Sequence, residues 1–246
     1  MTTHMANEQR VLQVEGAYNL RDLGGYKTKD GRMTRWGIFF RADGLHKLST
    51  LSQQELVDRG VRTIIDLRNA HELEEKKNVF ADSQQVSYHN VSLINPATSS
   101  LTQIRNLGDL YINLLQTSQA QLLRVFTLLA EGGIYGSLFH CAAGKDRTGV
   151  VSALLLDLGN VPHETILEDY VLTNACISPI LEELRKGKPA NVPDDMYESF
   201  LGCDPAYMVS LLSHLELRYG NAEHYLRTIG LSEGQILTLK EQLLTN

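Results

Sequence analysis

Short apolar runs alternate with helix-like segments over the first two-thirds of the chain. Val61 to Leu67 is rich in β-branched residues, which is typical of a buried parallel strand. Other short apolar stretches predict strands at Trp36 to Phe40, Val86 to Leu93 and Ser137 to Cys141. Over residues 119–130 the apolar side chains recur three and four positions apart, which predicts a helix before the last of these strands.

After residue 148 the pattern is helical only, beginning with a hydrophobic helix at Val150 to Leu158. Strands that alternate with helices, followed by helices alone, predict an α/β fold. We expect a central, mostly parallel sheet flanked by helices, with a C-terminal all-helical subdomain. We also expect a single domain over residues 1–246, with an α/β core at 16–160 and a helical part at 161–246.

The composition is that of an ordinary soluble globular protein, with 43% hydrophobic and 21% charged residues. No apolar run approaches the ~18 residues of a membrane span, so we expect no transmembrane segment. The formal net charge of -6 argues against a nucleic-acid-binding protein. Residues 160–246 carry 6 basic and 13 acidic side chains, whereas residues 1–159 carry 17 and 16. An anionic ligand is therefore expected to bind in the first two-thirds of the chain.

The chain has three cysteines: Cys141, Cys176 and Cys203. They are too few and too odd in number for a disulfide scaffold, and they lack the spacing of a zinc site. We therefore expect no metal and no cofactor. Residues 1–10 hold no apolar stretch that could serve as a signal peptide. The His4-Met5 pair resembles a cloning scar, and cloning of that kind removes a native leader. The predicted location is therefore either cytoplasmic or secreted. The oligomeric state is not predicted.

The most informative motif is the run HCAAGKDRTG at residues 140–149, between a predicted strand and a hydrophobic helix. Where a strand turns tightly into a helix, successive backbone N–H groups can converge on one point and bind an anion such as phosphate. Gly144 permits the tight turn, and Arg147 can close the ring with a planar contact to two oxygens. The predicted phosphate-binding residues are His140, Ala142, Ala143, Gly144, Lys145 and Thr148.

Cys141 begins this loop and is the predicted nucleophile. The positive field at the helix N-terminus favours the thiolate, which is the reactive form of cysteine. Thr148 is placed to donate its hydroxyl to that thiolate, and His140 is expected to order the loop through a hydrogen bond. The implied chemistry is in-line attack of sulfur on a phosphomonoester, followed by hydrolysis of a phosphocysteine by water. No metal is required, because the amides and Arg147 neutralise the phosphate charge.

The run at 140–149 resembles the signature loop of the protein tyrosine phosphatase superfamily. Its Lys145-Asp146 pair is similar to the bacterial branch that acts on phosphotyrosine and, in several members, on phosphoinositides. Further similarities cover most of the chain. They lie at Asn19 to Gly25, Arg41 to Leu45, Ile64 to Arg68 with Glu72 nearby, and Asp169-Tyr170 with Thr173-Asn174. It implies one metal-independent phosphatase domain that acts on phosphotyrosine proteins or phosphoinositides, with phosphate or vanadate as an active-site ligand.

Two aspartates are candidates for the general acid that protonates the leaving oxygen. Asp146 lies inside the loop, and the resemblance implies this assignment; the alternative is a surface aspartate that screens Lys145. Asp66 ends the predicted central strand, where α/β sheets place their sites, and its alternative is a helix cap or an arginine partner. Asp109 stands at the start of an apparent helix and is predicted to be its N-cap. We rank Asp146 first and Asp66 second.

Several alternatives stay open from the residues alone. Lys145 is expected to contact a second phosphate or a carboxylate, or else to be a solvated loop lysine. The acidic tail helices are expected either to form a lid or to pack as ordinary core, and His71 to Glu75 is predicted to be a solvated helical face. The alternative functions are a phosphoinositide-preferring lipid phosphatase, a rhodanese-like sulfurtransferase and a non-catalytic phosphate-binding protein. Arg147, six residues after Cys141, favours phosphate over persulfide chemistry.

Overall fold

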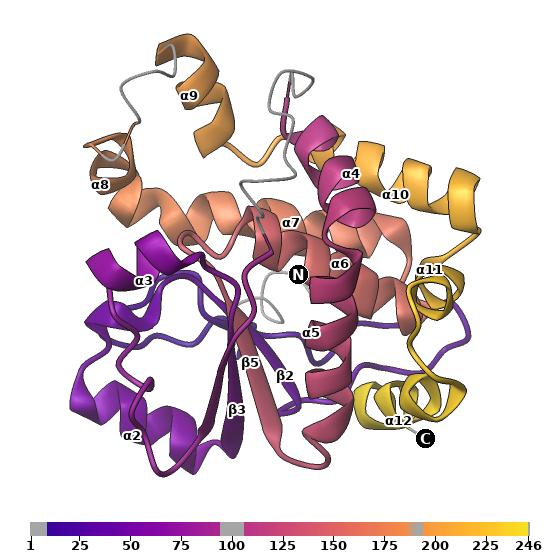
Figure 1. Cartoon of the computed structure of the whole chain (residues 1–246), viewed down its shortest axis with the longest axis horizontal. Coiled ribbons are helices and arrows are strands. Elements are labelled where there is room, and N and C mark those ends of the chain that lie inside the picture. The colour runs from indigo at the N-terminus through magenta and orange to yellow at the C-terminus, as the bar shows by residue number, and fades with distance from the viewer. Residues whose placement is uncertain (1–8, 94–105, 187, 189–193, 246) are drawn as a thin grey trace.

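The computed structural model describes residues 9–93, 106–186, 188 and 194–245; the His4-Met5 pair lies outside them. Within these residues five strands form one sheet in the order β1-β2-β5-β3-β4 (Figure 1). The strands are β1 (Arg21–Asp22), β2 (Phe39–Ala42), β3 (Val61–Asp66), β4 (Ser87–Asn90) and β5 (Gly136–His140). Strands β2, β5, β3 and β4 are parallel, and β1 pairs antiparallel with β2. The predicted mostly parallel sheet is confirmed.

The central strands contribute side chains to two separate hydrophobic clusters. Ile64 and Leu138 belong to the cluster that contains residues of helix α2, whereas Ile65 and Phe139 belong to the cluster that contains residues of α4, α5 and α6. These helices are α2 (Thr50–Asp58), α4 (Leu107–Thr117), α5 (Gln119–Glu131) and α6 (Asp146–Leu158). Successive side chains of a strand point to opposite faces, so a sheet covered on both faces requires the nearly continuous apolar runs seen in the sequence.

From His163 onward, every described element is helical, as predicted. The helices are α7 (His163–Ile177), α8 (Leu181–Lys186), α9 (Asp194–Leu201), α10 (Pro205–Tyr219), α11 (Ala222–Thr228) and α12 (Glu233–Leu243), with the 3-10 turn η3 (Ser178–Ile180) before α8. Helices α10 to α12 join the larger hydrophobic cluster, whereas α8 buries no residue and stands at the upper edge of the molecule in Figure 1. Across the described ranges, none of the helices has the length and apolar character that crossing a membrane requires.

Two helix ends show how local capping residues set the element boundaries. Gly60 follows α2 with a φ of +91°, a conformation that glycine adopts readily after a helix. The prediction that Asp109 is an N-cap is wrong. Asn106 caps α4, because its side chain accepts a hydrogen bond from the backbone N–H of Asp109 at 3.1 Å. Asparagine caps a helix as well as aspartate does, so the helix begins earlier and Asp109 lies in its first turn.

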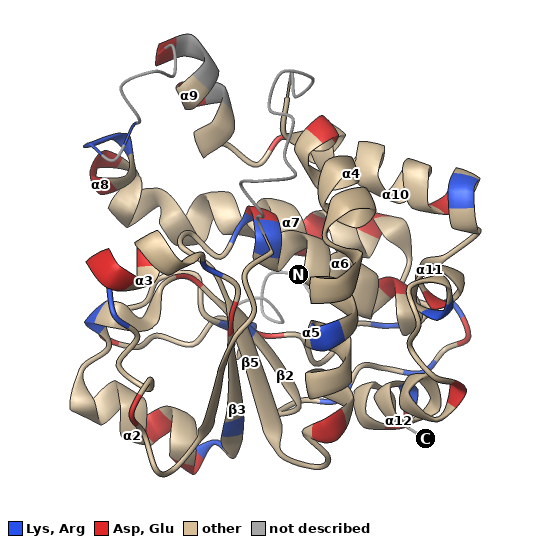
Figure 2. Ribbon diagram, in the orientation of Figure 1, with Lys and Arg blue, Asp and Glu red and all other residues tan. Residues whose placement is uncertain are grey.

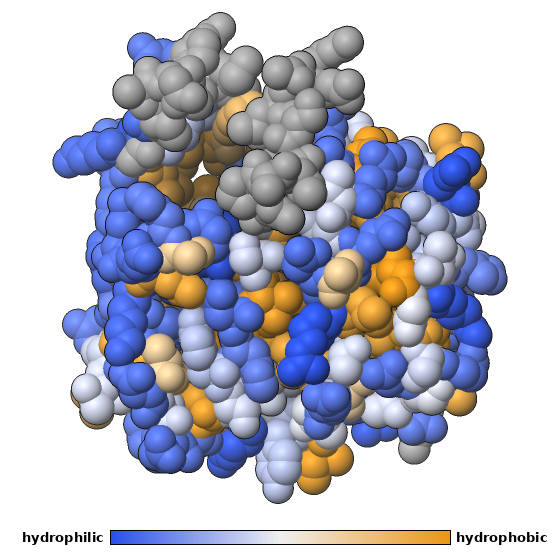
Figure 3. Space-filling model, viewed as in Figure 1, coloured by the Kyte–Doolittle hydropathy of each residue, from blue (hydrophilic) through white to orange (hydrophobic). Residues whose placement is uncertain are grey.

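Strand register brings three chain segments together at one edge of the sheet. Asp66 at the end of β3 and Ala42 at the end of β2 are both paired with His140, the last residue of β5. Parallel sheets place their sites at this carboxyl edge. Figure 2 shows that charged residues lie mainly on helices and loops, and Figure 3 shows hydrophobic side chains scattered among hydrophilic ones on the visible face. The apolar strands therefore support a polar edge, where the loop at 141–145 begins.

Candidate active site

The loop between β5 and α6 carries the predicted nucleophile. Cys141 follows the last residue of β5, and α6 begins at Asp146. Between them Gly144 has a φ of +66°, and a Cβ atom built there would lie 2.5 Å from the carbonyl oxygen of Ala42. Only glycine fits this turn without moving strand β2. The strand and the helix are thus joined by a short loop at the helix N-terminus, where backbone N–H groups favour an anion.

The carbonyl groups of this loop are bound from outside. The Asn19 side-chain amide donates hydrogen bonds to the carbonyl oxygens of Ala143 at 2.9 Å and Gly144 at 3.1 Å. Arg41 donates to the same Gly144 oxygen at 2.7 Å. The backbone N–H of Gly44 donates to the Ala142 oxygen at 2.9 Å. Because these carbonyls are turned outward, the loop is left with its N–H groups available to a central anion.

A buried charge cluster fixes the side chains that hold the loop. Asp169 of α7 accepts hydrogen bonds from Arg21 at 2.9 Å, Arg41 at 2.5 Å and the Tyr26 hydroxyl at 2.8 Å. Burial raises the pKa of Asp169, but the charges of Arg21 and Arg41 outweigh burial and hold it below its ordinary value. Because Arg41 reaches both Asp169 and Gly144, helix α7 is connected directly to the loop.

Cys141 is buried at the start of the loop, with 2% of its surface exposed. His140 lies beside it, within 3.1 Å of the Cys141 carbonyl oxygen through Nδ1 and within 3.2 Å of Asp66 through Nε2. The Asn78 side chain is 2.8 Å from the same Nε2 atom. The hydroxyl oxygen of Thr148 is buried without a hydrogen-bond partner among the described residues. His140 thus joins Asp66 and Asn78 to the start of the loop.

Arg147 is held in one plane by Glu72, a residue that sequence reasoning placed on a solvated helical face. Its two terminal nitrogens donate to the two carboxylate oxygens of Glu72, each at 2.7 Å. Burial lowers the pKa of Arg147, but its hydrogen bonds with Glu72 raise the pKa by more. The pKa therefore lies above its ordinary value, and the guanidinium group stays charged. The prediction for Glu72 was wrong, because α3 (Ala70–Glu75) turns this residue towards the loop. An Asn-x-x-Glu capping box from Asn69 to Glu72 is the signal that could have located it.

The two acid candidates lie in opposite environments. Asp66 is fully buried and accepts hydrogen bonds from Arg68 at 2.7 and 2.9 Å and from the Tyr88 hydroxyl at 3.1 Å. Burial raises the pKa of Asp66, but interactions with His140 and Arg68 bring it well below its usual range. Asp146, in contrast, is 29% exposed at the start of α6 and accepts one hydrogen bond, from the Tyr111 hydroxyl at 2.7 Å.

Comparison with known proteins places this arrangement in a family. A profile described as "Tyrosine phosphatase family" matches residues 12–245. The chain belongs to the tyrosine phosphatase family. The resemblance inferred from the loop at 140–149 is thereby confirmed over nearly the whole chain, and so is the prediction of a phosphatase of the tyrosine type.

Relatives within the family come from bacteria. The chain is 32% identical over 222 residues to a tyrosine-protein phosphatase of Nostoc commune, covering 83% of this chain and 74% of that protein. It is 26% identical over 284 aligned positions to the triple specificity protein phosphatase PtpB of Mycobacterium tuberculosis, covering 95% and 99%. A crystal structure of P. aeruginosa TpbA matches 73% of this chain and 89% of that one, with 14% identity and a TM-score of 0.32. That score is too low to decide anything about this chain.

Lys145 has the carboxylate contact that was one expectation for it, and it has two further partners in the helical tail. Its side chain is buried, and its ammonium group donates hydrogen bonds to the carbonyl oxygens of Phe200 and, at 3.0 Å, Gly202. It also lies 3.4 Å from Asp146. Lys145 is therefore not a solvated loop lysine, and its contacts join the loop at 141–145 to the C-terminal end of α9. The end of α9 is thus in contact with the loop, which sequence periodicity does not reveal.

The described part of the chain holds no group of three or more His, Cys, Asp or Glu side chains arranged to bind a metal ion. Cys176 is partly buried and Cys203 is buried, and both are free thiols. Burial raises the pKa of both thiols, which leaves them in the less reactive protonated form.

Proposed function

We propose that the chain hydrolyses phosphotyrosine in proteins through a covalent phosphocysteine on Cys141. The observation that carries this proposal is the bidentate hold of Glu72 on Arg147 beside a glycine-containing loop at a helix N-terminus. A guanidinium group fixed in one plane can bind two oxygens of the phosphoryl group during its transfer. The family and the tyrosine phosphatase of Nostoc commune support the substrate class.

In the first step, the Sγ atom of Cys141 attacks phosphorus, the P–O bond to the tyrosyl group breaks, and Asp146 gives its proton to the leaving oxygen. In the second step, Asp146 accepts a proton from water, the water oxygen attacks phosphorus, and the S–P bond breaks to return the thiolate and inorganic phosphate. Arg147, the loop N–H groups and the Thr148 hydroxyl stabilise the negative charge on oxygen and sulfur during these steps.

Asp146 is the stronger candidate for the acid because of its surroundings. A general acid must reach the leaving group and must hold a proton in part of the enzyme population. Asp146 lies at the loop with part of its side chain exposed, whereas Asp66 is fully buried and its pKa is held low by His140 and Arg68. We therefore propose that Asp66 is a positioning residue, which orders His140 and, through it, Cys141.

Phosphoinositide hydrolysis is the second candidate activity. The triple specificity phosphatase PtpB, which aligns over nearly the whole chain, supports a substrate range broader than phosphotyrosine. Lys145 was expected to bind the additional phosphates of such a lipid. Its contacts with Phe200 and Gly202 occupy its ammonium group, so phosphotyrosine stays the first choice.

We further propose one phosphatase domain, in which the helical part after residue 161 serves two roles. Helices α10 to α12 pack in the larger hydrophobic cluster, as ordinary core. A lid role would fall to α8, which buries no residue, and to α9, whose Phe200 carbonyl oxygen accepts a hydrogen bond from Lys145 of the loop. This assignment narrows the region in which closure over the substrate would be sought.

The decisive experiment compares aryl phosphate and phosphotyrosine peptide hydrolysis by wild type, Cys141→Ser and the matched control Cys176→Ser. We expect turnover that vanadate inhibits in wild type and in Cys176→Ser, and none in Cys141→Ser, because serine provides no accessible anion. Turnover that persists in Cys141→Ser would overturn the proposal. Absence of turnover in wild type, with phosphate still bound, would favour the non-catalytic alternative. An assay of sulfur transfer from thiosulfate to cyanide tests the sulfurtransferase alternative, which transfer activity without phosphatase activity would favour.

A further inference from the structure

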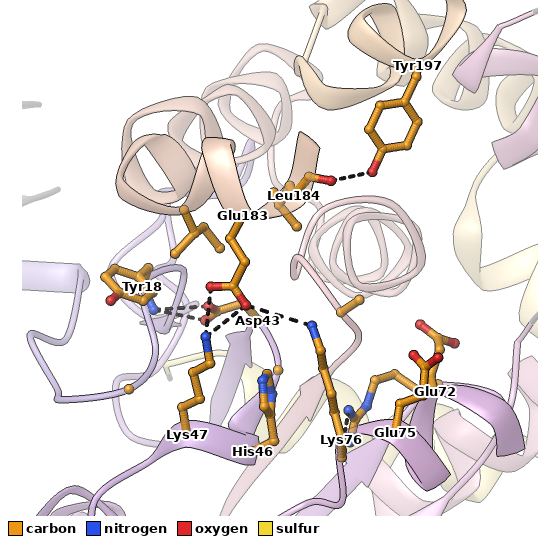
Figure 4. Close-up of a pocket in the computed structure, with 15 residues that line it drawn as sticks. Tyr18, Asp43, His46, Lys47, Glu72, Glu75, Lys76, Glu183, Leu184 and Tyr197 are labelled. Carbon is orange, nitrogen blue, oxygen red and sulfur yellow. Dashed lines mark hydrogen bonds and ion pairs between the residues drawn. The ribbon is translucent and has the colours of Figure 1, made fainter. Parts of the chain in front are cut away.

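A pocket lies next to the phosphatase loop (residues 141–145), and Ala142 of that loop forms part of its lining. Its volume is about 290 Å³, and Figure 4 shows basic side chains rising from one side towards α8 on the other. Lys47 ends the 3-10 turn η1 (Leu45–Lys47), and Lys76 follows helix α3, where Figure 2 also shows basic residues. Neither lysine belongs to the loop at 140–149.

The two lysines converge on one carboxylate from the helical tail. The Lys47 ammonium group donates to both carboxylate oxygens of Glu183, each at 2.8 Å, and the Lys76 ammonium group lies 3.8 Å from one of them. His46 faces the same pocket, and both of its ring nitrogens are buried without a hydrogen-bond partner in the described residues. Burial, with the charges of Lys76 and Arg68, lowers the pKa of His46 to about 4, so its ring is neutral and has one N–H to donate.

The other charged groups that line the pocket already have close partners. Arg68 is paired with Asp66, and Glu72 is paired with Arg147. Asp43 accepts from the backbone N–H groups of Tyr18 and Asn19 at 3.0 to 3.1 Å. Glu75 lies 3.7 Å from His71. Glu183 therefore holds the position to which Lys47 and Lys76 are directed, with an unsatisfied imidazole beside it.

The charge of this position favours phosphate over carboxylate. A substrate carboxylate would have the same charge as Glu183, which is tethered to the chain, and so would gain nothing by replacing it. A phosphate monoester carries about -1.5 to -2 and has three acceptor oxygens, enough for both lysines and the His46 N–H. The side chains of Lys47 and Lys76 are each 51% exposed, so a ligand can reach them.

The remaining pocket wall favours an aromatic phosphate. It is formed by Tyr18, Ile180, Leu184 and Tyr197. The Tyr197 hydroxyl donates to the Leu184 carbonyl oxygen at 2.6 Å, so this polar group is already satisfied (Figure 4). An apolar wall accommodates a phenyl ring, whereas the hydroxyl groups of an inositol ring would lose hydrogen bonds to water there.

From these observations we propose that the pocket is a subsite for a second phosphotyrosine of a doubly phosphorylated peptide. Lys47, Lys76 and His46 bind its phosphate, and Glu183 is the intramolecular anion that it displaces. Because Ala142 belongs to both the pocket and the phosphatase loop, one peptide can place one phosphate at Cys141 and the other here. This proposal rests on the proposed phosphotyrosine activity and specifies its preferred substrate.

The test measures kcat/KM for peptides that carry two phosphotyrosines, adjacent or a few residues apart, and for the same peptides with one. We expect wild type to prefer the doubly phosphorylated form several-fold. In the Lys47→Ala/Lys76→Ala variant the preference should fall to about one, with KM carrying most of the change, because each exposed ionic contact is worth a factor of a few. Glu183→Gln should increase the preference. High salt should reduce it in wild type.

Two matched controls occupy the same surfaces. Lys77→Ala changes the neighbouring lysine, which is paired with Asp82 outside the pocket, and Glu182→Gln changes the neighbouring glutamate, which is paired with Arg185. Both should keep the wild-type preference. An unchanged preference in Lys47→Ala/Lys76→Ala would overturn the subsite. A lysine-dependent gain for an inositol bisphosphate headgroup, without one for the peptides, would overturn the aromatic assignment.

Failure of the underlying activity gives a different result, which is no turnover of the singly phosphorylated peptide. In that case, equilibrium binding of the same peptides to Cys141→Ser protein makes the comparison without catalysis. Equal affinity for the two peptides would reject the subsite by itself. Tighter binding of the doubly phosphorylated peptide that depends on Lys47 and Lys76 would support it.

Discussion

Glu72 is the residue whose loss should most directly test how the phosphatase loop works. In Glu72→Ala, the Arg147 guanidinium loses two charge-assisted hydrogen bonds of 2.7 Å, and its longer contact with the Leu67 carbonyl oxygen, at 3.4 Å, is weaker. The group stays charged but is no longer fixed in the plane that two phosphoryl oxygens require. Misplacing such a group by about 1 Å costs on the order of 10²-fold in rate.

The stability of the fold should fall as well. Removing one partner of a buried ion pair costs about 3–5 kcal/mol. The Glu72 side chain is 24% exposed and the Arg147 side chain 10%, so water will screen part of that loss, and we expect about 2–3 kcal/mol. A fall of 10² in kcat/KM corresponds to about 2.7 kcal/mol, so the two effects should be of similar size. Glu72→Gln, which keeps the shape but not the charge, should fall between wild type and Glu72→Ala.

The assay is steady-state hydrolysis of an aryl phosphate together with urea unfolding of each variant. Glu74→Ala is the matched control, because Glu74 is an exposed acid on the same helix. It should retain wild-type kcat/KM and stability. If Glu72→Ala is destabilised by the expected amount but keeps wild-type kcat/KM, then Arg147 does not need Glu72 for catalysis, and the bidentate hold is only structural.

Two further predictions concern carboxylates. Asp146→Asn should lower kcat for a phosphotyrosine peptide more than for a nitrophenyl phosphate, because only the poorer leaving group needs a proton. Asp66→Asn should lower kcat for both substrates equally, and the opposite pattern in the two variants would reverse the two roles. Burial raises the pKa of Asp43 to about 6, against about 3.9 in an unfolded chain, so the folded state binds more protons between these values. The contribution of Asp43 to stability should therefore decrease as pH rises from about 4 to about 6. Urea unfolding of Asp43→Asn should lack this contribution, and identical pH profiles for variant and wild type would contradict it.

The sequence alone was sufficient for the fold class and for the family. The β-branched run at Val61 to Leu67 and the helical spacing at residues 119–130 each depend on a few neighbouring residues, so periodicity predicted β3 and α5 closely. The loop at 140–149 was also visible, because a strand, a glycine turn and a helix N-terminus follow one another directly in the chain. Cys141 and Arg147 are close in the structure since they are close in the sequence.

The tertiary structure decided which distant residues support that loop. Glu72 reaches Arg147 across 75 positions, and Asn19 reaches Ala143 across 124. Both contacts depend on how the strands are ordered in the sheet and on where helix α3 turns, which no local pattern contains. The same holds for Asp66 and Asp146, two aspartates of identical chemistry that the fold places in different surroundings, one fully buried and one partly exposed.

Lys145 shows the limit most clearly. Its position in the loop was known from the sequence, but its partners are carbonyl groups at the end of α9, 55 and 57 positions away. A backbone carbonyl is present at every residue, so the sequence contains no mark that distinguishes these two from the rest. Local hydrogen bonding and hydrophobic spacing are encoded within a few residues, whereas burial and the choice of partner arise only when remote segments pack together.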